Sequence, residues 1–187
     1  MSNGKKRVPS LLETVKIGIG YEHFVRLQAI DLHDFSLVKK KVAQDREGAS
    51  EGYLDWGVHY LKRYYALQVL DPLNPPAMSR PIDPFWHVHT LFTHQYIAFC
   101  DQVFGEYLHH VPLLFKDKLA TAFVAELYMR TVKRHAEVFT DVDFKFIPKS
   151  PDDGMCCTPT YGSNPKIISQ ALFPAEKIFL VKPIDVA

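Results

Sequence analysis

PIDPFWHVHTLFTHQYIAFCDQVFGEYLHHVP, residues 81–112, holds five of the nine histidines in this 187-residue chain. The stretch predicts one helix that begins at Pro84 and runs to about Phe104. Asp83 fits the N-cap of this helix, since a short acidic side chain accepts hydrogen bonds from the first free backbone N–H groups. Gly105 is expected to end it, because glycine readily adopts the left-handed backbone that closes many helices. The histidines therefore lie on or just beyond one helix.

Two further segments show apolar residues at spacings of three and four, the pattern of a helix with a buried face. They span residues 53–70 and about 113–138. The first is apolar around much of its circumference, so it is expected at the centre of the core. Weaker helical patterns lie within residues 11–44. A connection with five prolines, residues 71–84, must be irregular because proline removes backbone donors and fixes φ.

The fold class expected from these patterns is mainly α. We expect a compact helical bundle of about four to five helices, an irregular C-terminal arm and one short strand pair. A single domain over residues 1–187 is expected, with a helical core at about 11–138 and an extended loop and arm over 139–187. Within that C-terminal part, Phe144–Ile147 and Lys177–Val181 are the strand candidates.

Charge and cysteine content argue against several classes of protein. The formal net charge is +1 and the basic residues are scattered, so no nucleic-acid partner is expected. No apolar run approaches the roughly 20 residues that cross a bilayer, so no membrane partner is expected. Three cysteines do not make a disulfide framework, and a reduced, cytoplasmic protein fits them best.

Histidines and acids share one side of the helix predicted in residues 81–112. At about 100° per residue, Asp83, His87, His94 and Asp101 fall on one stripe, whereas His89 faces the other way. Asp83 and His87 are four residues apart, so their side chains can meet. His87 and His94 are two turns apart, too far to share one ion directly.

A tight metal site needs more than this local pair, because zinc and non-haem iron usually take three or more protein ligands. The chain reverses after Gly105, so one of His109 and His110 is expected to return over the helix. We assign Asp83, His87 and His110 as the metal ligands, and divalent iron or zinc as the cofactor. Further ligands, or residues that orient the first three, are expected among His89, His94, His109, Asp101 and His59. An aromatic pocket beside the site is expected to be lined by Trp86, Tyr96 and Tyr60.

Simpler roles remain open for the same residues. Asp83 also fits a purely capping role, and neutral histidines are often hydrogen-bonded within aromatic cores. Trp86 also fits a core anchor. Cys156 and Cys157 are adjacent, and neighbouring cysteines rarely chelate one metal well, so no role is assigned to them.

Residues 81–112 also carry a set of motifs at fixed offsets. An Asp-x-x-Trp-His-x-His segment starts at Asp83, a Tyr-x-x-Phe-Cys segment starts at Tyr96, and Gly105 precedes an ending at His110 and Pro112. In these motifs the chain resembles the glycine-rich domain-containing protein-like family, over roughly residues 35–135. The long glycine-rich region of the plant members is absent, so the closer comparison is a small stand-alone member. The resemblance implies no reaction, but it implies that Asp83, His87, His89 and His110 belong to one set.

Three functions fit these observations. The first is a metal-dependent enzyme acting on a small molecule, oxidative with iron or hydrolytic with zinc. The second is a non-catalytic interaction module in which the histidines and Trp86 are structural, around a structural metal ion, and the C-terminal arm binds a partner or a second copy. The third is a metal-free acid–base enzyme that uses His87 with Asp83 as its orienting group.

Overall fold

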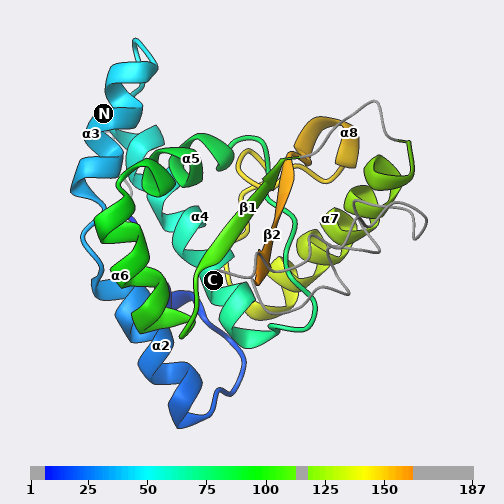
Figure 1. Cartoon of the computed structure of the whole chain (residues 1–187), viewed down its shortest axis with the longest axis horizontal. Coiled ribbons are helices and arrows are strands. Elements are labelled where there is room, and N and C mark those ends of the chain that lie inside the picture. Colours follow the sequence, from blue (N-terminus) through cyan, green and yellow to red (C-terminus); the bar gives the residue numbers. More distant parts are fainter. Residues whose placement is uncertain (1–6, 113–117, 162–187) are drawn as a thin grey trace, which may run out of the picture.

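The computed structural model describes residues 7–112 and 118–161 of the chain (Figure 1). This part of the chain is mainly helical, as the sequence predicts, with eight helices and two strands. The helices are α1 (Leu11–Thr14), α2 (Tyr21–Leu32), α3 (Ser36–Asp45), α4 (Glu51–Leu70), α5 (Asp83–Leu91), α6 (Thr93–Val103), α7 (Lys118–Val138) and α8 (Pro151–Gly154), and the strands are β1 (Leu108–Pro112) and β2 (Cys157–Tyr161). Within the described residues, no helix has both the length and the apolar character needed to span a membrane.

Helix α4 runs through the centre of the molecule and contacts α1, α2, α3, α5 and α7 (Figure 1). The Ser50 hydroxyl caps its first turn by accepting a hydrogen bond from Tyr53 N. Its buried residues then run almost without interruption from Gly57 to Val69. All faces of this part of the helix are therefore covered, as its wide apolar surface predicts.

The prediction of one helix over residues 84–104 is wrong, because the structure divides it at Phe92 into α5 and α6. Phe92 has φ −81° and ψ 61°, outside the helical region. The Thr90 hydroxyl donates to His87 O at 2.7 Å. Phe92 N bonds only three residues back, to His89 O. Such local bonds compete with the regular helical pattern and bend or end a helix.

Strands β1 and β2 form an antiparallel ladder between α5 and α6 on one side and α7 and α8 on the other (Figure 1). The register pairs Leu108 with Tyr161 and Pro112 with Cys157. Gly105, with φ of +78°, follows α6 as predicted and lets the chain turn into β1. Neither β1 nor β2 is one of the predicted strand candidates, and α8 and β2 lie within residues 139–187, which were predicted as an extended loop and arm.

The strand predicted at Phe144–Ile147 is also wrong. This segment is a turn, in which Phe146 N and Ile147 N both bond to Asp143 O. Phe146 and Ile147 are both buried and Phe144 is exposed, so burial does not alternate along this segment as it would in a strand. The second strand candidate, Lys177–Val181, lies outside the described residues.

Substituting Gly57 with alanine should destabilise the fold by about 3 kcal/mol, as expected for overpacking a close contact. A Cβ at Gly57 would lie 2.1 Å from Phe85 Cζ and 2.3 Å from Cε2, so α4 and α5 would have to separate. Urea unfolding measures this change. Gly52→Ala is the matched control, because a Cβ at Gly52 has no heavy atom within 4 Å and alanine favours the helix by about 0.5–1 kcal/mol. Equal effects of the two substitutions would contradict the proposed contact.

Candidate metal centre

Four potential metal ligands from three separate segments meet beside the first turn of α5. They are Asp83 and His87 on α5, His110 on β1 and Cys157 at the start of β2, and one ligand atom from each lies within 4.8 Å of all the others. His87 Nε2 is 3.0 Å from His110 Nε2 and 3.3 Å from Asp83 Oδ1. Cys157 Sγ donates to Asp83 Oδ1 at 3.1 Å. The structure thus brings together the three residues assigned as ligands and adds a cysteine.

Asp83 is the first residue of α5 and not its N-cap, which is Ile82. The N-cap prediction is therefore wrong. The Asp83 carboxylate faces His87 Nε2 and Cys157 Sγ, and its side chain is only 12% exposed. A buried carboxylate is costly unless it is paired, and Asp83 has both of these groups within 3.3 Å.

Backbone pairing with the segment before α5 fixes the position of Cys157. Met78 N donates to Cys157 O at 2.7 Å, and Cys156 N donates to Met78 O at 3.0 Å. Ser79 forms an isolated bridge with Met155 in the same region. Since Met78 lies five residues before Asp83 in the sequence, these bonds bring the thiol to the start of α5.

Aromatic packing fixes His110 on the other side of the cluster. The His110 ring makes an edge-to-face contact with Trp86, with ring centroids 4.8 Å apart. Trp86 Nε1 donates to Tyr96 OH at 3.2 Å, and Tyr96 OH donates to Leu108 O on β1 at 2.7 Å. This buried chain ties α5, α6 and β1 together, so His110 is held at a defined distance from His87.

Burial and neighbouring groups shift the pKa of two of the four ligands, His110 and Cys157. Burial lowers the pKa of His110, the neighbouring His87 lowers it further, and Asp83 opposes both effects. A side-chain hydrogen bond with Cys156 raises the pKa of Cys157 far above its usual value, and burial and the Asp83 charge add to this rise. A bound metal ion would have to displace the thiol proton, as it does at cysteine sites in general.

His89, which the sequence placed on the opposite side of the helix, lies outside this cluster. It is fully buried, and its Nδ1 is 2.8 Å from Tyr65 OH. Its ring also packs against His33 and Phe99. His89 therefore belongs to the aromatic core behind the metal cluster.

The structure does not bring the other predicted residues into the cluster of four. His94, Asp101 and His109 are exposed. His59 is buried on α4, where its ring packs against Trp56 and Tyr60. The three residues expected to line an aromatic pocket are fully buried in the core. They are Trp86, Tyr96 and Tyr60.

Sequence reasoning missed Cys157. Its neighbour Cys156 suggested a poor chelating pair, but only Cys157 faces Asp83. Cys156 instead takes part in a side-chain hydrogen bond with Cys157. The approach of Cys157 depends on its backbone bond with Met78 and on the strand pairing with Pro112, and neither can be read from local sequence patterns.

Comparison with known protein families identifies a family that this chain matches. Residues 25–124, just over half of its length, match the model of the UCP032817-like family. The chain belongs to this family. The matched region contains Asp83, His87 and His110 but ends before Cys157. No curated protein and no solved structure matches the chain.

Proposed function

We propose that this UCP032817-like protein binds one divalent transition-metal ion, best matched by zinc, through Asp83, His87, His110 and Cys157. The observation that carries the proposal is the convergence of four ligand atoms within 4.8 Å. Contacts of 3.0, 3.1 and 3.3 Å within the cluster are close to the edge lengths of about 3.3–3.6 Å of a tetrahedral zinc site. The remaining separations, which reach up to 4.8 Å, would have to shorten to similar lengths on coordination.

The ligand types favour zinc. Two imidazoles and a thiolate are poor ligands for magnesium or calcium, which prefer oxygen. Four protein ligands fill a tetrahedral shell, and filled shells are typical of structural zinc. The ion would then join β1 and β2 to α5, in a protein that acts as a non-catalytic helical interaction module.

A second candidate is a metal-dependent enzyme that acts on a small molecule. It is favoured by the exposure of the His87 side chain, which is 49%, because solvent could reach one side of the ion. In this version Asp83, His87 and His110 bind the ion, and Cys157 stays protonated. Two histidines and a carboxylate with open positions are typical of non-haem iron and oxidative chemistry, and zinc with an open position activates water for hydrolysis.

Further expectations from the sequence stay proposals. A metal-free acid–base enzyme would use the 3.3 Å approach of His87 Nε2 to Asp83 Oδ1. The three free cysteines fit a reducing, cytoplasmic setting. The resemblance to the glycine-rich domain-containing protein-like family stays a prediction, as does self-association through the C-terminal arm, whose residues 162–187 lie outside the described part.

Cobalt substitution should distinguish these functions. With all four ligands bound, the Co²⁺ protein should show a near-ultraviolet charge-transfer band from the Cys157 thiolate and the intense visible bands of four-coordinate cobalt. Cys157→Ser should abolish the charge-transfer band, and the matched control Cys156→Ser should keep it. Elemental analysis of the protein purified without a histidine tag should give about one ion per chain.

Other results would favour the alternatives. Stoichiometric metal without a thiolate band in the unaltered protein would exclude the four-ligand site and support an open three-ligand site. No binding of zinc, iron or cobalt would contradict both metal proposals. The His87–Asp83 acid–base enzyme would then be the remaining catalytic candidate.

A further inference from the structure

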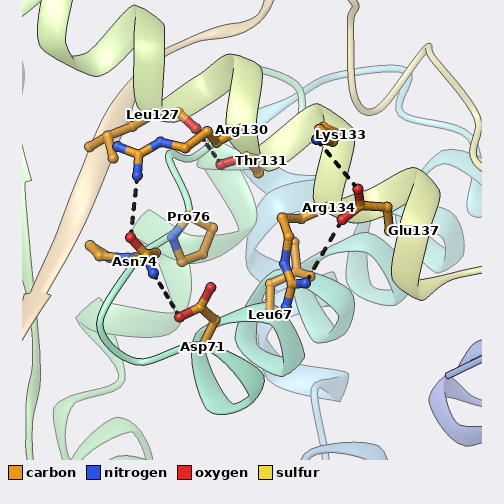
Figure 2. A pocket seen from close by; sticks show the side chains of 11 residues that line it. Leu67, Asp71, Asn74, Pro76, Leu127, Arg130, Thr131, Lys133, Arg134 and Glu137 are labelled. Atoms are coloured by element: carbon orange, nitrogen blue, oxygen red, sulfur yellow. Dashed lines mark hydrogen bonds and ion pairs between the residues drawn. The ribbon is translucent and has the colours of Figure 1, made fainter. Parts of the chain in front are cut away.

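A cavity of about 260 Å³ lies between the end of α4, the proline-containing loop that follows it, and α7 (Figure 2). It is separate from the candidate metal centre, with which it shares no residue. Its volume is just below the range of about 300–1,000 Å³ that is typical of sites for drug-sized ligands. A ligand for this cavity must therefore be small.

The floor of the cavity is apolar. Leu67 on α4 and Leu127 on α7 are almost fully buried, at 3% and 4% exposed, and both line the cavity. Pro75 and Pro76 complete this surface from the loop, and both are buried. An aliphatic group of a few carbon atoms would cover this surface and exclude water from it.

Three cations on one face of α7 border the cavity: Arg130, Lys133 and Arg134. Arg130 donates to Asn74 Oδ1 at 3.2 Å. Arg134 approaches Glu137 only to 3.8 Å, which is an ion pair but too long for a hydrogen bond. Each guanidinium has five N–H donors, so both retain donors for a carboxylate, which arginine recognises in a two-pronged geometry.

A carboxylate borders the same cavity from the end of α4. Asp71 Oδ1 accepts from Asn74 Nδ2 at 3.0 Å, and no cation of the described residues pairs with Asp71. Asp71 is the C-cap residue of α4, where the helix dipole also favours a positive group. Figure 2 shows Asp71 and Arg134 approaching the space beside Pro76 and Leu67 from α4 and α7.

We propose that this cavity binds a free α-amino acid with an aliphatic side chain. The ligand carboxylate pairs with Arg134, its ammonium group pairs with Asp71, and its side chain covers Leu67 and Leu127. A zwitterion pairs with the arginine and with Asp71 at the same time. A carboxylic acid leaves Asp71 unpaired, and an amine leaves Arg134 unpaired. An uncharged apolar ligand would leave both Asp71 and Arg134 unpaired.

Isothermal titration calorimetry on the full chain tests the proposal with three probes that share the same branched aliphatic group. L-Leucine carries both charges, 4-methylpentanoate lacks the ammonium group, and 3-methylbutylamine lacks the carboxylate. L-Leucine should bind with a dissociation constant below about 1 mM. Each analogue should bind at least about tenfold more weakly, because each loses one charge-assisted contact.

Two substitutions assign the ends of the ligand. Asp71→Asn keeps an oxygen for Asn74 and should weaken L-leucine about tenfold while leaving 4-methylpentanoate unchanged. Arg134→Gln should weaken both ligands. Arg26→Gln is the control, since Arg26 is exposed on α2 and does not line the cavity. The proposal is overturned by the absence of saturable L-leucine binding at about 10 mM, by equal binding of L-leucine and 4-methylpentanoate, or by an equal effect of Arg26→Gln.

Discussion

Free zinc at a thousand times its dissociation constant should raise the melting temperature of the metal-free protein by about 8–16 °C. An ion that binds only the folded chain adds about 4 kcal/mol to the free energy of unfolding under these conditions. In a domain of this size, 1 kcal/mol changes the melting temperature by about 2–4 °C. Differential scanning calorimetry in EDTA and in buffered zinc measures the shift.

The position of the cluster explains why the effect should extend beyond the site. Its four ligands belong to α5, β1 and β2, which are far apart in the sequence, so they come together only in the folded chain. A preformed site of this kind does not exist in the unfolded state, and the free energy of binding then becomes free energy of folding. Zinc should therefore stabilise the attachment of β2 to the helical core as well as the ligands themselves.

Neighbouring residues provide matched controls for this result. His110→Ala should remove most of the zinc-dependent shift, whereas His109→Ala should keep it, because His109 is exposed and lies outside the cluster. Cys157→Ser and Cys156→Ser form a second pair with the same expectation. A shift that survives in His110→Ala, or that is lost in His109→Ala, would contradict the ligand assignment.

Local patterns were sufficient for the helices and for part of the cluster. The 3.6-residue periodicity of residues 53–70 predicted α4 and its central position, because a helix that is apolar on most faces must be covered. The i, i+4 spacing of Asp83 and His87 predicted their approach, since it depends only on helical geometry. The turn at Gly105 made the return of His110 predictable in the same way.

Non-local pairing explains what the sequence did not reveal. Cys157 reaches Asp83 through backbone bonds to Met78 and through the ladder with β1, and neither has a local signature. The division of the predicted helix at Phe92 depends on the side-chain bond of Thr90, which competes with helix only in this context. An extended loop and arm was predicted over residues 139–187, but pairing with β1 makes Cys157–Tyr161 a strand.

Lowering the pH from 7 to 5 should reduce the free energy of unfolding of the metal-free protein by about 6 kcal/mol through three buried histidines. Burial lowers the pKa of His59, His89 and His135 to about 3 in each case. The neighbouring Arg63 cation contributes to the lowered pKa of His59 and His135. Domains of this kind are stable by only about 5–15 kcal/mol, so the loss is comparable to the total.

The sign follows from where each histidine takes up its proton. In the unfolded chain a histidine takes up a proton below a pH of about 6.5, whereas these three stay neutral in the folded chain until about pH 3. The unfolded state therefore binds more protons between these values. The contribution of the three histidines to the free energy of unfolding is fully present above pH 6.5. It is lost as the pH falls, with a slope of about 4 kcal/mol per pH unit for the three groups together.

His135→Phe isolates one of the three contributions. The His135 ring is fully buried against Tyr60 and Phe139, and neither of its nitrogens has a hydrogen-bond partner among the described residues. Phenylalanine keeps the ring packing and removes the titration, so the fold should be retained at pH 7. The slope between pH 6 and 4 should fall by about 1.4 kcal/mol per pH unit.

Urea unfolding at intervals between pH 4 and 8, with EDTA present throughout, separates this effect from loss of the metal. Above pH 7 the three histidines are neutral in both states, so their contribution to the slope should vanish there and serve as an internal control. An unchanged acid slope in His135→Phe would show that His135 is already protonated, or already hydrated, in the folded chain. Burial of His135 beside the Arg63 cation would then be wrong as a cause of acid sensitivity.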